Sequence, residues 1–266
     1  MAKWGTLKDK VIIITGMTQN IGKDIYQEFA AEGAIVIGCG RSAEKGEKVC
    51  ADVVANGGKA EFFHVDVRDE DGVKAMVEAV AAKYGRIDGL VNNAAAYGPY
   101  GAIPTTDLTA ADMRASFDTC VIGTFLMTKY VGKEMVKAQS GRIVDILSIF
   151  GFKATPVMTP YHVSKAALLM LMKQDALTYG KKGIRVNGVA PGSIIGAESW
   201  PGYVSYYGVN TIEEAKEVHK KSVVNSNTLG RWGEPEEIAA AVRFFLAEDD
   251  FCNGAVINCD GGSYIM

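Results

Sequence analysis

Short apolar runs alternate with helical patterns along most of this chain, and that alternation limits the fold more than any other feature. The first run, 11–15, is β-branched and lacks polar alternation, as expected of a strand covered on both faces. A helical pattern with apolar residues four apart follows it and ends near Gly33. Strands that alternate with helices predict an α/β fold, a doubly wound parallel sheet with helices on both faces. The other expected strands lie at 34–39, 61–65, 90–92, 143–148, 185–190 and 255–258, and the other expected helices at 72–84, 110–138, 159–180 and 235–247.

Length and segment composition predict a single domain over residues 1–266. A chain of this length can bury one large core, and no repeat, low-complexity tract or Pro/Gly-rich linker marks a second unit. The irregular region is about 193–228, where four aromatic residues among glycines precede a charged helical pattern at 212–221. At the carboxyl edge of the sheet such an insertion would bind substrate. The alternative is an ordinary surface loop with aromatic packing.

The composition indicates a globular protein that acts on small molecules. Hydrophobic residues make up 48% of the chain and charged residues 22%, and the net charge of −3 gives no electrostatic reason to expect nucleic acid or an anionic membrane as a partner. Five cysteines without a Cys-x-x-Cys pair and only three histidines argue against a zinc site, and we expect no metal. The odd cysteine count is typical of reduced thiols. Because no signal-like or membrane-length apolar stretch is found, we expect a cytoplasmic protein.

Tyr161 and Lys165, with Ser148 upstream, form a candidate proton-transfer site. Residues four apart on a helix lie on one face, so the phenol and the ammonium can reach one reacting group. A free tyrosine has a pKa of about 10, and a fixed positive charge beside it favours the phenolate. The Ser148 hydroxyl can hold a substrate oxygen while Tyr161 passes the proton. By itself the five-residue motif is explained better by a core aromatic and a solvated lysine, so the rest of the chain has to decide.

A glycine-containing turn joins the first expected strand to the first expected helix. It contains Gly16 and Gly22, with Asn20 between them. Glycine after a buried strand allows a tight turn, and the helix N-terminus then presents free N–H groups and a positive dipole end to a phosphate. In this strand–turn–helix context the glycines indicate a dinucleotide site.

These motifs make the chain resemble the short-chain dehydrogenase/reductase family over nearly its whole length. The family's turn, Thr-Gly-x-x-x-Gly-x-Gly, is matched except that Asn20 stands at the middle glycine; asparagine tolerates left-handed backbone angles, but its side chain can crowd or bond the pyrophosphate. Further matches follow in the family's order, so chance is a negligible explanation. They are Asp66-Val67, the segment 92–95, the catalytic Ser148, Tyr161 and Lys165, the segment 187–192 and Asp260-Gly261-Gly262.

The resemblance implies a Rossmann-like fold, a nicotinamide dinucleotide cofactor and a homo-oligomer, commonly a tetramer or dimer. Asp66 is expected beside the adenine, and the segment 187–192 under the nicotinamide. The residues expected to bind the cofactor are Gly16, Thr18, Asn20, Ile21, Gly22, Arg41, Ser42, Asp66, Val67, Asn93, Ala94, Tyr161, Lys165, Pro191, Gly192 and Ile194.

The residues after the second strand favour NADP(H) over NAD(H). The family's NAD-binding members use an acidic residue there for the ribose hydroxyls, but this chain has Gly40, followed by Arg41 and Ser42. An acid would repel a 2′-phosphate, whereas a guanidinium and a hydroxyl can bind it. If Arg41 is only solvated or stacks on adenine, NAD(H) is the alternative.

Two further positions depart from the family pattern. Cys120 stands where the family has an asparagine that helps to hold a water beside the active-site lysine, and a thiol is a weak hydrogen-bonding group. A small buried helix residue is the simpler interpretation of Cys120 than a reactive thiol. Gly196 stands where the family often has a threonine that contacts the nicotinamide, and Ser193 or Ser199 could substitute for it.

The sequence therefore predicts an oxidoreductase that transfers hydride reversibly between a nicotinamide cofactor and a secondary alcohol or ketone. Aromatic and apolar residues at the expected carboxyl edge favour an apolar, cyclic or aromatic substrate. A 3-ketoacyl thioester is the alternative substrate, and a cofactor-binding sensor or scaffold without catalysis is the alternative of another class. The expected substrate-pocket residues are Tyr97, Phe150, Met158, Trp200 and Tyr203, with Tyr100 and Phe152 nearby.

Overall fold

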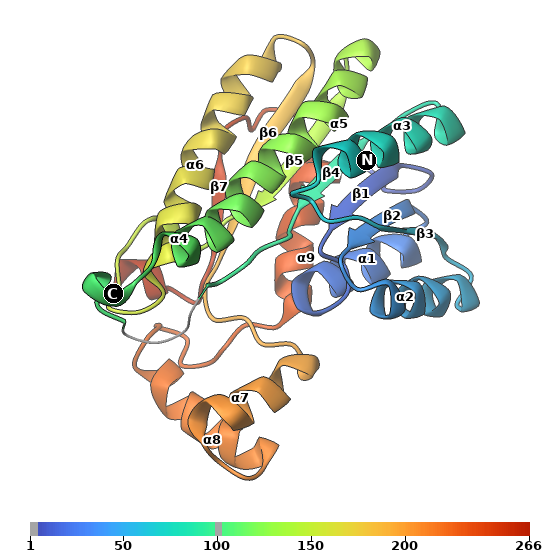
Figure 1. Cartoon of the computed structure of the whole chain (residues 1–266). Coiled ribbons are helices and arrows are strands. Elements are labelled where there is room, and N and C mark those ends of the chain that lie inside the picture. Colours follow the sequence, from blue (N-terminus) through green and yellow to red (C-terminus); the bar gives the residue numbers. More distant parts are fainter. Residues whose placement is uncertain (1–4, 99–102) are drawn as a thin grey trace.

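A parallel sheet of seven strands runs through the described part of the chain. The computed structural model describes residues 5–98 and 103–266 (Figure 1). The strands lie in the order β3-β2-β1-β4-β5-β6-β7, and each neighbouring pair is parallel. The predicted doubly wound parallel sheet is confirmed. In chain order the strands are β1 (Val11–Thr15), β2 (Ile35–Gly40), β3 (Lys59–His64), β4 (Gly89–Asn92), β5 (Gly141–Ile146), β6 (Ile184–Pro191) and β7 (Val256–Cys259).

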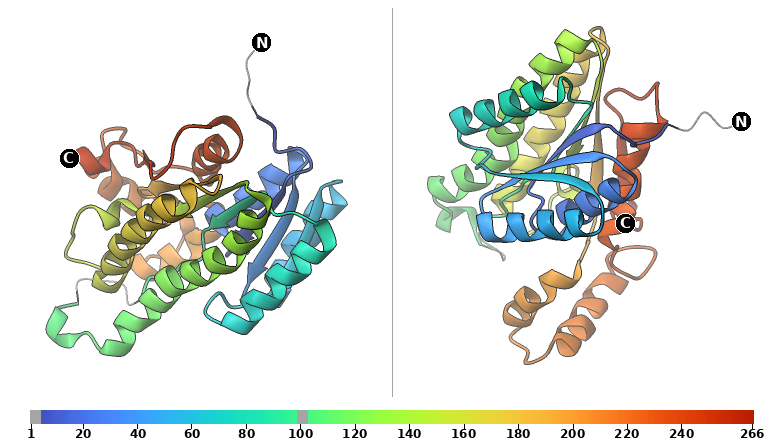
Figure 2. Two further views of the ribbon diagram at one scale, coloured as in Figure 1. Left: turned by 90° about the horizontal axis from the view of Figure 1, so that it is seen from above. Right: turned by 90° about the vertical axis from the view of Figure 1, so that its right-hand side faces the viewer.

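Helices cover both faces of the sheet because its central strands are apolar on both sides. In β1, Val11 and Ile13 pack against one layer, whereas Ile12 and Ile14 pack against the other. The first layer contains α3, α5 and α6, and the second contains α1, α2 and α9, as Figure 2 shows from two directions. No helix within the described ranges has the length and apolar content needed to cross a membrane. The helices of both layers are α1 (Asn20–Ala31), α2 (Ala43–Ala55), α3 (Glu70–Tyr84), α5 (Thr124–Ala138), α6 (Thr159–Gly180) and α9 (Pro235–Arg243).

Some helical features differ from the sequence prediction. The sequence pattern does not predict α2, because Val49 and Val53 are its only large apolar residues that are buried, and so thin a stripe gives a weak helical signal. The helix predicted at 110–138 is divided into α4 (Ala110–Phe117) and α5 by a π-helical segment, Asp118–Gly123. Such segments are frequent at functional sites, and this one contains Cys120.

The irregular region at about 193–228 forms an arm that follows the carboxyl end of β6. We call residues 193–228 the arm; it contains α7 (Trp200–Tyr207) and α8 (Ile212–Val224). Figure 1 shows these two helices as a pair that stands away from the sheet and its covering layers. The arm has an apolar core of its own, separate from the cores on the two faces of the sheet.

Candidate active site

The turn between β1 and α1 leaves its backbone open to a ligand. Gly16 has φ of +67° and Asn20 has φ of +47°, so both lie in the left-handed region that glycine and asparagine tolerate best. A side chain at Gly22 would collide with the Gly16 carbonyl oxygen and with Asn93 Nδ2. Only glycine fits at positions 16 and 22 without displacing these neighbours, so the two glycines allow the turn to pack closely against the end of β4.

Hydrogen bonds from the end of β4 hold this turn in place. The Thr15 hydroxyl accepts from the backbone N–H groups of Asn93 at 3.0 Å and Ala94 at 2.9 Å. In return, Asn93 Nδ2 donates to the carbonyl oxygens of Thr15 at 3.0 Å and Gly16 at 3.1 Å. Asn93 thus fixes the turn with its side chain while it also lines the neighbouring cleft.

A cleft of about 320 Å³ opens at this carboxyl edge of the sheet. Most residues predicted to bind the cofactor line it: Gly16, Thr18, Asn20, Ile21, Arg41, Ser42, Asp66, Val67, Asn93, Ala94 and Ile194. The other predicted residues, Gly22, Tyr161, Lys165, Pro191 and Gly192, do not line it. Gly22 packs behind the turn, Gly192 lies against the backbone of Asp260, and Tyr161 lies beside the cleft residue Tyr97. Lining residues that the sequence analysis does not name as cofactor-binding residues are Gln19, Gly40, Lys45, Val65, Ala95, Tyr97 and Thr119.

One end of the cleft carries basic and hydroxyl groups. Arg41 and Lys45 both line it, and Ser42 Oγ caps α2 by accepting from Lys45 N at 3.4 Å. Asp66 also lines the cleft, but its carboxylate is paired with Arg68 at 2.6 Å, and this hydrogen bond lowers the pKa of Asp66. Lys45 comes four residues after Arg41, and this spacing of two basic residues could have predicted Lys45 as a cofactor-binding residue from the sequence.

Ser148, Tyr161 and Lys165 lie together where β5 ends and α6 begins. Lys165 is 2% exposed, and its Nζ donates to the Ile146 carbonyl oxygen at 2.6 Å and lies 5.5 Å from the centre of the Tyr161 ring. Burial lowers the pKa of the Lys165 ammonium, while Cys120 and Asp145 act in the opposite direction. Tyr161 and Ser148 are 8% and 7% exposed. All three predicted residues are therefore buried. Lys165 lies beside Tyr161, and Ser148 comes two residues after the Ile146 carbonyl that Lys165 bonds.

A buried carboxyl group lies beside this trio and is not among the residues predicted from sequence. Asp145 is fully buried in β5, and Asn92 Nδ2 donates to its Oδ1 at 2.8 Å and to Thr128 Oγ1 at 3.2 Å. Within the described residues, Oδ2 of Asp145 and Oδ1 of Asn92 have no hydrogen-bond partner. Burial raises the pKa of Asp145 to about 7, with Asp175 acting in the same direction and Lys165 against it. A single acid inside an apolar strand is the signal that could have revealed it.

Cys120 is a fully buried anchor for the loop that follows β4. Its Sγ donates to the Ala96 carbonyl oxygen at 3.6 Å, and the Ser116 hydroxyl donates to the same oxygen at 2.7 Å. Ser164 Oγ lies 3.0 Å from Ser116 Oγ and 2.9 Å from the Tyr161 carbonyl oxygen, and its single proton can be donated to either of them. These bonds tie α4 to the first turn of α6, behind Tyr161. The packing of Cys120 agrees with a small buried helix residue.

Three of the predicted substrate-pocket residues surround Tyr161. The ring of Tyr97 lies 4.9 Å from that of Tyr161, and the ring of Phe150 meets it edge-on at 6.4 Å. Met158 packs against the same cluster. His162 stacks on Phe150 at 4.2 Å and bonds the Met158 carbonyl oxygen at 3.1 Å, which fixes the loop between β5 and α6. The expected pocket residue Tyr100 lies outside the described residues.

The other two predicted pocket residues, Trp200 and Tyr203, lie in the core of the arm. Trp200 is 5% exposed and lies 5.6 Å from Tyr203, centre to centre. His219 is buried beside them and uses both ring nitrogens within the arm, toward Tyr207 Oη at 2.7 Å and Ser193 Oγ at 3.1 Å. The structure does not bring Trp200 and Tyr203 to Tyr161, because both rings pack between α7 and α8.

The sequence model of the family described as short chain dehydrogenase matches residues 10–199. The chain belongs to this family. The match spans the turn, the cleft and the trio around Tyr161.

Relatives of this dehydrogenase act on several kinds of alcohol and ketone. A 3-oxoacyl-(acyl-carrier-protein) reductase of Thermotoga maritima is 34% identical over 261 residues, 97% of this chain and 99% of the relative. A 2,5-dichloro-2,5-cyclohexadiene-1,4-diol dehydrogenase of Sphingobium indicum is also 34% identical, over 96% of this chain and 97% of the relative. The crystal structure of L-sorbose reductase from Gluconobacter frateurii with NADPH and L-sorbose covers 100% of both chains, with a TM-score of 0.91 and 26% identity. This chain is an oxidoreductase of the family.

The cleft of this dehydrogenase fits a nicotinamide dinucleotide. The turn residues Gly16, Thr18 and Asn20 line the cleft at the N-terminus of α1, where backbone N–H groups and the helix dipole favour a phosphate. The cleft then continues from Arg41 at one end to Ala95 and Tyr97 near Tyr161 at the other.

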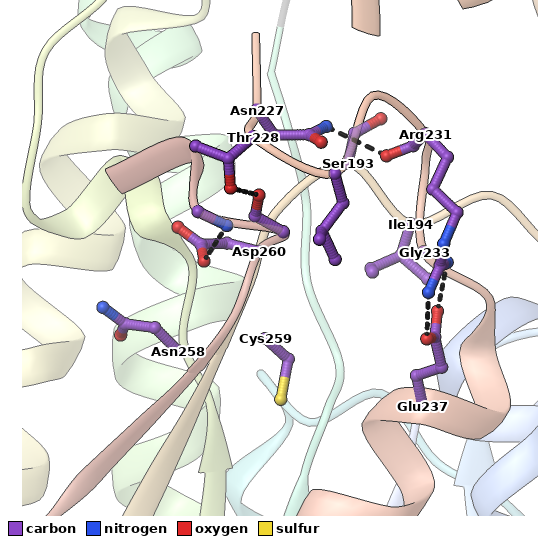
Figure 3. A pocket seen from close by; sticks show the side chains of 13 residues that line it. Ser193, Ile194, Asn227, Thr228, Arg231, Gly233, Glu237, Asn258, Cys259 and Asp260 are labelled. Atoms are coloured by element: carbon purple, nitrogen blue, oxygen red, sulfur yellow. Dashed lines mark hydrogen bonds and ion pairs between the residues drawn. The ribbon is translucent and has the colours of Figure 1, made fainter. Parts of the chain in front are cut away.

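A second hollow of about 380 Å³ lies beside the base of the arm (Figure 3). Ile194 lines both this hollow and the cleft. Arg231 is paired with Glu237 at 2.6 Å, and the Asp260 carboxylate accepts from the backbone N–H groups of Gly262 and Tyr264. The C-terminal Asp260-Gly261-Gly262 motif thus lines this hollow together with Ile194, and its charged side chain already has partners within the chain.

Proposed function

We propose that this protein reversibly oxidises a secondary alcohol to a ketone with NADP(H). The observation that carries the proposal is the buried trio, in which Lys165 lies over Tyr161 and Ser148 is nearby at the end of β5. A protein that only binds a cofactor has no use for a proton donor at this place. The same arrangement argues against the alternative of a sensor or scaffold without catalysis.

In the proposed mechanism the protein moves one proton. The Ser148 hydroxyl bonds the substrate oxygen, and Tyr161 donates a proton to that oxygen in reduction and removes it in oxidation. The ammonium of Lys165, held by the Ile146 carbonyl oxygen at 2.6 Å, stabilises the phenolate that proton donation leaves behind. When bound, the nicotinamide cofactor supplies or accepts the hydride.

The charge at the far end of the cleft supports NADP(H) as the cofactor. Gly40 ends β2 without an acidic side chain, and a Cβ there would lie 3.2 Å from Thr18 Cγ2, so little room exists for one. Arg41 and Lys45 supply two cations and Ser42 a hydroxyl for a 2′-phosphate. NAD(H) is the alternative, which applies if Arg41 is only solvated or stacks on the adenine.

The wall around Tyr161 supports an apolar and cyclic or aromatic substrate. Tyr97, Phe150 and Met158 present ring and thioether surfaces next to the proposed proton donor. The relative that oxidises a cyclohexadiene diol gives a precedent for a cyclic substrate. A 3-ketoacyl thioester is the second candidate, favoured by the 34% identity with the 3-oxoacyl reductase.

We further propose that the protein works as a homo-oligomer, a dimer or tetramer, in the cytoplasm. Val163, Met170 and Leu177 are exposed at seven-residue spacing along α6, and Phe125 of α5 is exposed as well. Such a stripe suits burial between copies of the chain. The cytoplasmic location rests on the cysteine content.

The proposal is tested by turnover of a matched panel of substrates. Cyclic ketones, aromatic ketones, sugars and a 3-ketoacyl thioester are each supplied with NADPH or NADH, and the nicotinamide absorbance is followed; oxidation of the matching alcohols is measured in parallel. We expect turnover of cyclic or aromatic ketones with a higher kcat/KM for NADPH. Cofactor binding without turnover of any substrate would favour the sensor instead, and a preference for NADH would contradict the cofactor assignment.

A further inference from the structure

Two departures from the family pattern, Asn20 and Gly196, are one structural feature. They are 176 positions apart by their residue numbers, yet a Cβ at Gly196 would lie 2.8 Å from Asn20 Oδ1 and 3.6 Å from Asn20 Cα. Gly196 has φ of −77° and ψ of 161°, an extended backbone that any residue adopts. The Asn20 side chain therefore occupies the space that a side chain at 196 would use, and Pro235 Cγ adds a contact at 3.3 Å.

Asn20 also bonds the arm directly. Ser199 Oγ donates to Asn20 Oδ1 at 2.8 Å. Ser199 immediately precedes Trp200, which is buried in the core of the arm, so this hydroxyl is attached to the rigid part of the arm. Asn20 itself lies in the cofactor turn and lines the cleft. One amide oxygen thus connects the turn that receives the phosphates to the first helix of the arm.

We propose that Asn20 is a positioning residue that clasps the arm to the cofactor turn and so sets where the arm closes over the substrate. Relative to the family pattern, position 20 carries asparagine in place of glycine, and position 196 carries glycine in place of threonine. The side chain gained at 20 therefore fills the space of the side chain lost at 196. Because the clasp joins two binding elements, occupation of the turn by the cofactor and placement of the arm stabilise each other. That the arm binds substrate is the expectation drawn from its place at the carboxyl edge of the sheet, and only the turnover assays below rest on the proposed function.

The position of Asn20 allows its side chain to be tested without disturbing the backbone. Its φ of +47° suits glycine, so Asn20→Gly removes the amide and keeps the turn. Gly196→Thr supplies the side chain that the family often carries. If the two positions share one space, Gly196→Thr lowers kcat/KM sharply in the wild-type background and much less in the Asn20→Gly background. Independent effects of the two changes would overturn the proposal.

A second comparison isolates the hydrogen bond. Ser199→Ala is expected to raise the substrate KM about 3- to 10-fold, the effect of one lost hydrogen bond, and to change kcat less. Ser205→Ala is the matched control, because Ser205 is exposed on the neighbouring helix α7. Adding Ser199→Ala to Asn20→Gly has no further effect if the bond is the shared contact. Equal losses from Ser199→Ala in both backgrounds would contradict it.

A measurement without substrate keeps this inference separate from the proposed function. Limited proteolysis of the arm is followed with and without NADPH. We expect NADPH to slow cleavage in the wild-type protein and in Ser205→Ala, and to slow it clearly less in Asn20→Gly and Ser199→Ala, with the binding of NADPH to each variant measured separately. Equal protection in all four proteins, each saturated with NADPH, overturns the clasp even if no substrate is ever turned over.

Discussion

The surroundings of Tyr161 and the arm are built in opposite ways. Tyr161 and Lys165 are one helical turn apart on α6. The end of β5 holds Lys165 through the Ile146 carbonyl oxygen, and the π-helical segment packs against Tyr161. The arm packs mainly on itself, around Trp200, and reaches the cofactor turn through Ser199. The comparison supports the proposal of a fixed centre for proton transfer, beside an arm that has its own apolar core and that we expect to select the substrate. A family can keep the first and vary the second, as its range of substrates requires.

The largest effect should come from Lys165→Met, which tests whether Lys165 takes part in the reaction or only stabilises the fold. Methionine fills much of the volume of the lysine but carries no charge, so we expect turnover to fall at least about 1000-fold. The melting temperature should not fall, because burial already disfavours the ammonium. Turnover and thermal denaturation of the same preparation check both points. Retained turnover would show that Lys165 is only a buried structural cation.

Trp200→Ala tests whether the arm is a separate unit. Removing a buried indole costs about 3 to 5 kcal/mol, which should loosen the arm and raise the substrate KM about 10-fold or more, while NADPH binding changes little. Tyr206→Ala, at a ring that is 59% exposed on the same helix, is the control. If Trp200→Ala instead abolished NADPH binding and unfolded the sheet, the arm would not be separate from the rest.

Asp145→Asn tests the buried carboxyl group behind the fixed centre. Because the folded pKa of Asp145 is raised to about 7 from 3.8, the folded state keeps a proton that the unfolded state loses. The free energy of unfolding therefore falls as pH rises through this window, by about 2 to 4 kcal/mol. Asparagine does not titrate, so the variant should gain stability over wild type between pH 5 and pH 8.

Denaturant unfolding at the two pH values measures this difference. Asp175→Asn is the control, since the pKa of Asp175 is raised by burial to about 6 and its effect should be smaller. Parallel pH dependence of the wild-type protein and Asp145→Asn would mean that Asp145 is ionised throughout.

Cys120→Ser should have the smallest effect. A serine hydroxyl can donate to the Ala96 carbonyl oxygen as the thiol does, so we expect kcat within about 2-fold of wild type and an unchanged pH profile. Cys39→Ser is the control. Cys39 is a buried thiol in β2, so this variant measures how much the free energy of unfolding changes when a buried thiol becomes a hydroxyl away from Tyr161. A shifted pH profile for Cys120→Ser alone would place the thiol in the path of the proton.

The two regions also differ in how far sequence could predict them. The sheet followed from apolar runs, which are short-range periodic patterns. Helical spacing placed Tyr161 and Lys165 on one face, but only the resemblance to the family assigned proton transfer to them. Trp200 and Tyr203 sit in an equally aromatic segment, but the face that each ring uses depends on α8, which pairs with α7 only in three dimensions. The contact between Asn20 and Gly196 was visible as two unrelated departures. Only the fold shows that they share one space.

The most direct test of the fixed centre is Tyr161→Phe, with NADPH binding and turnover measured on the same preparation and Tyr206→Phe as the control. Phenylalanine keeps the ring that packs on Tyr97 and Phe150 and removes only the proton donor. We predict that turnover falls at least about 1000-fold while the Kd for NADPH stays within about 3-fold of wild type. Turnover above about a tenth of the wild-type rate, with NADPH binding intact, would contradict the assignment of Tyr161 as the acid and base.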